Sequence, residues 1–285
     1  MLVSWRYRKR ASLLQKFDPR AWLIFYACFL ASTLSFWDVR YLGGMALLAL
    51  FWVLTSGVQW RESRRAWLFI GGFIVFFSVL TFFTGRGGME VYTEEHLLRR
   101  LEVPFTIFGW QPVIKVTLER SLFALSQMMR VFSIAALTIL IPYSINPAQY
   151  GIIFRGLGLP DKIAYAMDMT MRFVPTYGRD FQLTLDAQRA RGYELENLKG
   201  GLINQVRKMA PLIVPVTIHA IIGSEDIIDA MDLRAFGVGP RTWLEELHYR
   251  KRDYTLIAFS VMMFLTCVAL SLFGLGKFWV PLGLP

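Results

Sequence analysis

Long stretches without charge dominate the hydrophobic pattern of the chain. Four windows contain no Asp, Glu, Lys or Arg at all: 21–37, 41–60, 66–85 and 254–276. A fifth window, 121–143, is interrupted only by Arg130. A helix that spans a bilayer needs about 20 predominantly apolar residues. The pattern therefore predicts an all-α membrane protein with about five transmembrane helices.

The segment between the windows 121–143 and 254–276 has a helical pattern but is rich in charge. Asn146-Pro147 predicts the start of a short helix, and the glycines before Pro160 predict its end. A second helix is expected from Pro160 to about Arg191, and a third from residue 202 to about 236. We expect these long helices to lie in the cytoplasm or at the membrane surface.

Three regions follow from this pattern. Residues 1–143 form a basic N-terminal segment and a four-span membrane region, with an extracellular excursion at 86–120 that could be a hairpin. Residues 144–253 form the cytoplasmic helical region, and 254–285 contain the last transmembrane helix.

One stretch of the third long helix allows two interpretations. Residues 209–224 are uncharged, which makes a sixth span possible, but 16 residues are few for a span. A span there would also place Arg234, Arg241 and the basic residues 250–252 outside the cell, against the positive-inside rule. We favour a helix at the membrane surface or buried between helices.

The composition agrees with a membrane protein and excludes several other classes. Of the 285 residues 55% are hydrophobic and 15% aromatic, and the mean hydropathy is +0.42. These values exclude a disordered chain, a collagen-like chain and a disulfide scaffold. Cys28 and Cys267 fall in separate predicted spans, so we interpret them as small hydrophobic residues.

The net charge of +10 indicates either nucleic-acid binding or membrane topology, and the position of the basic residues decides between them. Six of them precede the first window and three lie at 61–65, whereas 86–120 carries five basic and five acidic residues. The positive-inside rule then places the N-terminus in the cytoplasm and the C-terminus outside. The bilayer is the expected partner of this charge, and no nucleic-acid partner is expected.

An internal repeat ends the two long helices. DAQRARGY at 186–193 aligns with DAMDLRAF at 229–236, at an offset of 43 residues. Arg191 and Arg234 would each lie in the last turn of a helix, where the helix dipole favours a cation by about 0.3–1 kcal/mol. The small residue that follows lets another surface approach the backbone. For one copy alone, an ordinary C-terminal arginine explains the pattern; two copies favour a pair of plugs for two similar sockets.

Several segments resemble one family of membrane proteins. They are FDPR at 17–20, NPAQYGIIFRGLGLP at 146–160, MTMRFVPTYGRD at 169–180, AQRARGY at 187–193 and AMDLRAFGVGPRT at 230–242. From about residue 17 to residue 274 the chain resembles the T component of energy-coupling-factor (ECF) ABC transporters. In that family it is the transmembrane coupling subunit of importers for vitamins and transition-metal ions.

The resemblance implies a coupling role without catalysis. The chain would transmit the ATP-driven motion of two ABC ATPase subunits to a separate substrate-binding membrane protein, the S component. It would be a multi-pass protein of a bacterial or archaeal plasma membrane. ATP and Mg²⁺ would bind to the partner ATPases, so no cofactor and no metal are expected in this chain.

The resemblance also assigns docking residues. In the family, Ala-Arg-Gly-type motifs at the ends of two coupling helices enter grooves of the two ATPases. The matching positions are Ala190, Arg191 and Gly192 in the first copy and Leu233, Arg234 and Ala235 in the second. The second copy departs from the pattern, because Leu and Ala stand where Ala and Gly are common.

Flexible side chains on the same helices could form the interface with the S component. They are Met167, Met169, Met171, Met209 and Met231. Methionine adapts to irregular and changing surfaces, but it also fills ordinary cores, and the sequence favours neither interpretation.

Other function classes have weaker support. The chain has no G-x-x-x-x-G-K-[ST] phosphate-binding loop, and the nearest candidate, at 274–277, lacks its first glycine and its hydroxyl residue. An intramembrane enzyme would need polar catalytic groups at one depth, and the predicted spans contain almost none. A membrane scaffold for soluble partners, without transport, is the remaining alternative.

Arg130 is the one charge inside a predicted span. A charge there costs about 2.5–3.5 kcal/mol on insertion scales and usually faces a partner group. We expect Arg130 to form a structural ion pair or to contact a backbone carbonyl, with a transport role as the less favoured alternative.

Overall fold

The computed structural model describes residues 7–10, 12–84, 97–102, 113–193, 202–239, 245–274 and 276. Contacts divide the chain into two units. Tyr7–Ile145 and His248–Pro285 belong to the first, called here the membrane unit. Asn146–Leu247 belong to the second, called here the long-helix unit.

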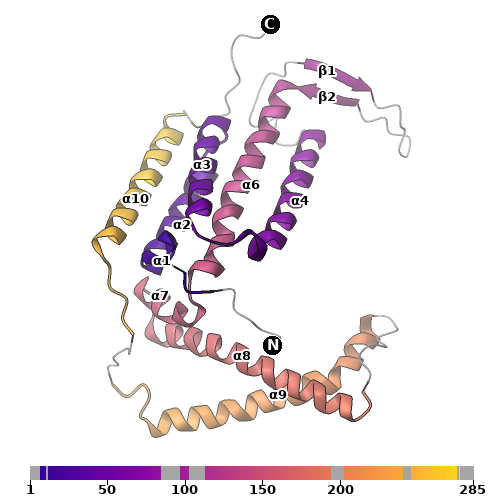
Figure 1. Ribbon diagram of the computed structural model, residues 1–285, viewed down its shortest axis with the longest axis vertical. Helices are drawn as coiled ribbons and strands as arrows, with labels where there is room; N and C mark the ends of the chain where they lie inside the picture. The colour runs from indigo at the N-terminus through magenta and orange to yellow at the C-terminus, as the bar shows by residue number, and fades with distance from the viewer. Residues whose placement is uncertain are drawn as a thin grey trace. The chain divides into compact units, whose positions relative to one another are not determined.

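The membrane unit is a bundle of helices (Figure 1). Its helices are α1 (Leu13–Lys16), α2 (Pro19–Leu34), α3 (Val39–Thr55), α4 (Trp60–Thr84), α6 (Leu118–Ser144) and α10 (Lys251–Leu272). The end of α6 lies beside the start of α4, because the Tyr143 hydroxyl donates to the Glu62 carbonyl at 3.1 Å. The starts of α2 and α10 also meet, since the Asp18 N–H donates to the Asp253 carboxylate at 2.9 Å. We call this end of the bundle, marked by those four residues, the basal end.

Aspartates determine where two of the helices begin. Asp18 precedes α2 and accepts from the Arg20 N–H at 2.9 Å, and Asp38 precedes α3 and accepts from the Arg40 N–H at the same distance. Each arginine also pairs with its aspartate through the guanidinium group. An aspartate at this position satisfies backbone donors that a helix otherwise leaves free.

Within the described part of the chain, four helices are long and apolar enough to cross a membrane: Trp60–Phe82, Arg120–Ser144, Met209–Leu233 and Lys251–Leu272. The first two predicted windows form shorter apolar helices, α2 with 16 residues and α3 with 17. The helix that contains 209–224 continues to Leu233, so the candidate span is 25 residues long, and its last nine residues include Glu225, Asp226, Asp229 and Asp232. Its length and composition allow a span, and the preference for a helix at the membrane surface or buried between helices stays a prediction.

A small β-hairpin interrupts the helical pattern. Strand β1 (Leu97–Glu102) pairs antiparallel with β2 (Val113–Thr117), and a register shift lies between Leu97 and Arg99. The all-α class is confirmed for the body of the chain, with these strands as the exception among the described residues. The hairpin expected within 86–120 is confirmed; residues 85–96 and 103–112 lie outside the description.

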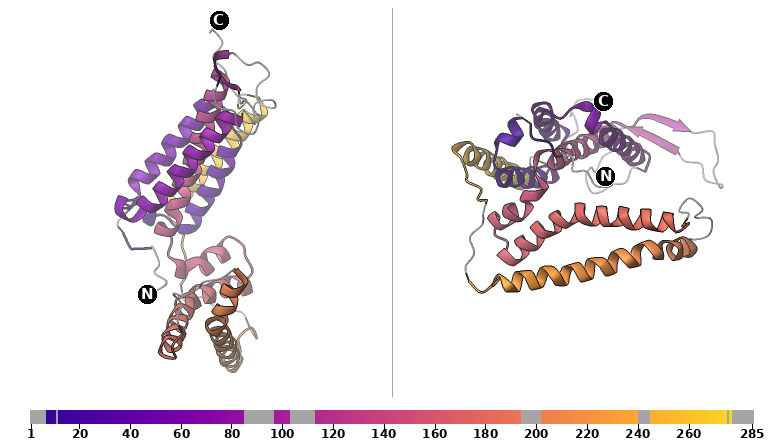
Figure 2. Two further views of the ribbon diagram at one scale, coloured as in Figure 1. Left: turned by 90° about the vertical axis from the view of Figure 1, so that its right-hand side faces the viewer. Right: turned by 60° about the horizontal axis from the view of Figure 1, so that its bottom comes forward.

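The long-helix unit contains the 3-10 helix η1 (Pro147–Gln149) and the helices α7 (Tyr150–Gly156), α8 (Asp161–Ala190) and α9 (Leu202–Leu233). Asn146 caps η1, as the sequence predicts, by accepting from the Ala148 N–H at 3.2 Å. Figures 1 and 2 show α8 and α9 running alongside each other.

Contacts at both ends fix the direction of the α8–α9 pair. Near the end of α8, the Gln188 side chain donates to the Pro211 carbonyl of α9 at 3.2 Å. Near the start of α8, the ring of Tyr165 packs on Phe236, which follows α9, with centroids 4.5 Å apart. The two helices are therefore antiparallel.

Candidate functional site

The end of α8 is closed by a Schellman motif. Gly192 has a positive φ of 83°, and its N–H donates to the Arg189 carbonyl at 2.9 Å. The Tyr193 N–H donates to the Gln188 carbonyl at 3.0 Å. These two bonds satisfy carbonyls that the helix end would leave free. Arg191, between the helix and the glycine, is held in a fixed backbone turn.

The end of α9 repeats this turn bond for bond. Ala235 has a positive φ of 51°, and its N–H donates to the Asp232 carbonyl at 2.9 Å. The Phe236 N–H donates to the Met231 carbonyl at 3.0 Å. The left-handed conformation costs a residue with a Cβ roughly 1–2 kcal/mol. The repeat found in the sequence is therefore also a repeat of structure, kept in the second copy at an energetic cost.

Both helices end one residue before the arginine, whereas the sequence predicted each arginine within the last helical turn. The last helical residues are Ala190 and Leu233, so Arg191 and Arg234 follow the last turn instead of lying within it. We call Ala190, Arg191 and Gly192 the 191 tip, and Leu233, Arg234 and Ala235 the 234 tip. All six residues are exposed, and Leu233 is 89% exposed. Both tips are accessible to a partner.

The antiparallel pairing places the two tips at opposite ends of the pair. The 234 tip lies near the start of α8, because Phe236 packs on Tyr165, while the 191 tip is at the end of α8. A helix of 30 residues is about 45 Å long, so the tips are separated by about that distance. Two antiparallel helices are related by an approximate two-fold axis, and each tip is thus the counterpart of the other.

The two copies differ in charge although their backbones agree. The 186–193 segment carries one acidic and two basic residues, and Asp186 pairs with Arg189 at 3.7 Å. The 229–236 segment carries two acidic residues and one basic residue, because Asp232 replaces Arg189. The two tips therefore have the same backbone turn, but the charged residues around that turn differ.

The five candidate methionines are all half-buried on α8 and α9. Met231 has a defined role within the unit, since its sulfur lies 3.8 Å from the Tyr165 hydroxyl. That contact favours internal packing for this one residue.

The sequence identified the uncharged stretch 209–224 but not the exposed apolar face that it forms on α9. Its exposed aliphatic side chains are Ile213, Val214, Ile218, Ile221, Ile222 and Ile228. Their spacing follows a helical face, which is the signal that could have identified them. Such a face needs a cover of lipid or protein.

Arg130 contacts a backbone carbonyl, as one of the two expected alternatives stated. Its guanidinium donates to the Phe36 carbonyl and, at 3.3 Å, to the Gln127 side chain. The group also lies 4.4 Å from the centre of the Trp37 ring. The side chain is buried and ties α6 to the turn between α2 and α3.

A buried clamp at the basal end was not predicted. One Asp253 oxygen accepts from the Asp18 N–H at 2.9 Å, and the other accepts from the Arg250 N–H at 2.7 Å. The guanidinium of Arg20 lies 4.0 Å from the centre of the Tyr249 ring. Burial raises the pKa of the Tyr249 phenol above its ordinary value. The clamp joins the starts of the first and last long helices of the membrane unit.

No three His, Cys, Asp or Glu side chains lie close enough to hold a metal ion within the described part of the chain. Cys28 and Cys267 are free thiols.

Comparison with known proteins gives a consistent result. A family model named CbiQ, described as cobalt transport protein, matches residues 10–243. The energy-coupling factor transporter transmembrane protein EcfT of Lactobacillus helveticus is 27% identical over 92% of this chain and 91% of its own length. The EcfT protein of Lacticaseibacillus paracasei is 25% identical over 95% of this chain and 98% of its own length. That of Exiguobacterium sibiricum is 30% identical over 57% of this chain and 64% of its own length.

Proposed function

The chain belongs to the CbiQ family of membrane transport proteins, which includes its EcfT relatives, and we propose that it is the coupling subunit of an ECF-type importer. In this role it transmits ATP-driven motion of two ABC ATPase subunits to a substrate-binding membrane subunit. The observation that carries the proposal is the pair of matching turns, each presenting an exposed arginine, at opposite ends of one antiparallel helix pair.

The geometry suits a partner with two similar sockets. Two ATPase subunits that face each other offer equivalent grooves related by a two-fold axis, and the tips have an approximate two-fold relation of their own. Arg191 and Arg234 can each form fork-like hydrogen bonds to carboxylates or carbonyls of a groove. The different charge of the two copies favours two non-identical ATPases.

ATP and Mg²⁺ belong to those ATPases in this proposal, and the chain itself catalyses no reaction. The apolar face of α9 and the methionines of α8 and α9 other than Met231 form the surface for the S component, which binds the vitamin or transition-metal ion. This chain would therefore transmit motion without contacting the substrate.

The basal end faces the cytoplasm of a bacterial or archaeal cell in this proposal. Arg8, Lys9 and Arg10 lie there, and Arg61, Arg64 and Arg65 are exposed in the first turns of α4. The positive-inside rule favours the cytoplasmic side for such a group. With five alternating spans, the N-terminus is then inside and the C-terminus outside.

Charge reversal at the tips tests the coupling role. The chain is co-expressed with two ECF ATPases and one S component, purified, and assayed in proteoliposomes for ATP-dependent uptake. We expect Arg191→Glu or Arg234→Glu to reduce co-purification of the ATPases and uptake at least about tenfold, because each places an unpaired charge in a fitted groove. The double variant should abolish both.

Arg179→Glu is the matched control, since Arg179 is exposed on α8 away from both tips. Unchanged uptake in the double variant would refute the coupling role. If the ATPases co-purify through the tips but ATP drives no uptake, the chain is a scaffold without transport.

A further inference from the structure

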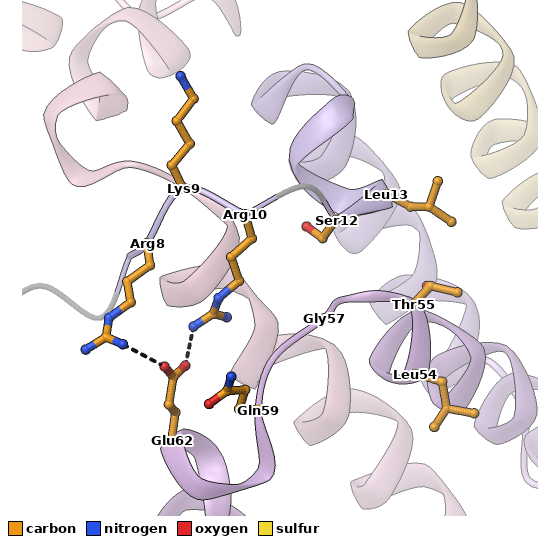
Figure 3. A pocket seen from close by; sticks show the side chains of 10 residues that line it. All are labelled: Arg8, Lys9, Arg10, Ser12, Leu13, Leu54, Thr55, Gly57, Gln59 and Glu62. Carbon is orange, nitrogen blue, oxygen red and sulfur yellow. Dashed lines mark hydrogen bonds and ion pairs between the residues drawn. The ribbon is translucent and has the colours of Figure 1, made fainter.

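A cavity of about 620 Å³ lies at the basal end of the membrane unit (Figure 3). Its wall comes from two segments. The N-terminal segment supplies Arg8, Lys9, Arg10, Ser12 and Leu13, and the segment from the end of α3 into α4 supplies Leu54, Thr55, Gly57, Gln59 and Glu62. The volume falls within the range of ordinary small-molecule sites, about 300–1,000 Å³. Two segments far apart in sequence thus form one site.

Positive charge dominates this wall. Glu62 is its one acidic residue, against Arg8, Lys9 and Arg10. Arg8 pairs with one Glu62 oxygen at 3.1 Å and Arg10 pairs with the other. Figure 3 shows both arginines reaching towards Glu62, whereas Lys9 points the opposite way. One carboxylate therefore serves two cations, and the third cation of the wall, Lys9, points away from that carboxylate.

The carboxylate does not satisfy Arg10 completely. Its Nη1 atom is buried and has no hydrogen-bond acceptor among the described residues. Buried donors in native proteins nearly always have an acceptor. Arg61, Arg64 and Arg65 add further exposed positive charge on either side of Glu62. The wall as a whole is suited to an anion.

One border of the cavity is apolar and exposed. Leu54 of the wall is 74% exposed and Leu13 is 46% exposed. From Leu54 an exposed stripe follows one face of α3 through Phe51 to Leu47, which are 55% and 69% exposed. Trp60 at the start of α4 is 64% exposed, and tryptophan is enriched where a membrane meets water. The cavity therefore opens where an apolar helix face ends and a basic surface begins.

We propose that this cavity binds the phosphate headgroup of an anionic phospholipid, with an acyl chain along Leu54, Phe51 and Leu47. A phospholipid has the same division into an anionic head and an apolar tail at the same boundary. Juxtamembrane basic clusters attract anionic headgroups. The bound lipid would hold the N-terminal segment against the turn between α3 and α4. Because the whole cavity belongs to the membrane unit and contains neither tip, this proposal does not depend on the coupling role.

Lipid retention by the full-length chain tests the proposal. The chain is reconstituted in nanodiscs of phosphatidylcholine with a minor share of phosphatidylglycerol, and native mass spectrometry measures which lipid stays bound and how tightly. We expect one retained phosphatidylglycerol. Arg8→Gln with Lys9→Gln removes two cations but keeps the Arg10–Glu62 pair, and should weaken its binding about 30-fold.

Glu62→Gln should have the opposite effect. It removes the competing carboxylate and should tighten phosphatidylglycerol binding about fivefold. A purely structural role of the Glu62 pairs predicts no such gain. Lys162→Gln with Arg179→Gln, which removes two exposed charges from α8, is the matched control and should change nothing.

Three results would overturn the proposal. One is equal retention of phosphatidylcholine, which carries no net charge. Another is unchanged or weaker phosphatidylglycerol binding in Glu62→Gln, or unchanged binding in the Arg8–Lys9 variant. The third is displacement of the lipid by an equal concentration of inorganic phosphate, which would make the cavity a phosphate site that does not use the acyl chain.

Discussion

Ala235 and Gly192 adopt the same turn with a positive φ, although alanine carries a Cβ and glycine does not. The two copies can be aligned from the sequence, and the alignment shows that a small residue follows each arginine. It could not indicate a positive φ at Ala235, because alanine rarely adopts that conformation and nothing in the local pattern marks it. Arg130 was easier to predict, since a buried charge must find a polar group and carbonyls are always near.

Substitution at Ala235 tests the strain at this residue. We expect Ala235→Gly to raise the stability of the chain by about 1 kcal/mol, because glycine adopts positive φ without a Cβ clash. The thermal unfolding midpoint of the purified chain in detergent measures the change. Ala230→Gly, one turn earlier within α9, should lower stability by about 1 kcal/mol, because glycine is unfavourable inside a helix. A lower midpoint for Ala235→Gly would show that the turn is unstrained.

At the scale of elements, the short α7 and the long α8 meet through Gly151. The sequence predicted where η1 and α8 begin and where α7 ends, because caps, proline and glycine mark these points locally. The contact between α7 and α8 could not be predicted, since it depends on how two helices approach in space. A Cβ at Gly151 would lie 2.5 Å from the Ala164 carbonyl oxygen and 2.8 Å from the Asp168 Cβ.

Gly151→Ala should therefore loosen this contact. The clash involves backbone, so the helices must shift, at a cost of about 1–3 kcal/mol. A lower thermal midpoint and faster amide hydrogen exchange in α7 are the expected results. Gly223→Ala in α9 is the control, because nothing lies within 4 Å of its added Cβ and helix propensity alone should leave it neutral or stabilised. Equal behaviour of the two variants would contradict the proposed packing.

At the scale of the whole molecule, the apolar windows predicted the order of the membrane helices. The windows could not predict which helices pack together, because a uniformly apolar stretch does not show which face is buried. The neighbouring starts of α2 and α10 and the wall of the basal cavity depend on such packing. From the sequence, the N-terminal positive charge was interpreted only as a topology signal, whereas in the structure Arg8, Lys9 and Arg10 line the basal cavity.

The orientation of the membrane unit can be tested by cysteine labelling. In a Cys28→Ser, Cys267→Ser background, Gln59→Cys places a thiol at the basal end and Leu34→Cys places one at the other end of α2. We expect a membrane-impermeant maleimide to label Leu34→Cys in intact cells, and Gln59→Cys only after permeabilisation. Labelling in the reverse pattern would invert the proposed orientation.

The clamp between Asp18 and Asp253 has a consequence for biosynthesis. The hydrogen bond joins residues 235 positions apart, so the start of α2 is completed by a segment that is translated long after it. Until α10 leaves the ribosome, the Asp18 N–H lacks its acceptor and α2 lacks the neighbour beside its start. Contacts between such distant residues form late in folding. A chain terminated before residue 250 would therefore lack the Asp253 acceptor and leave the start of α2 without α10 beside it.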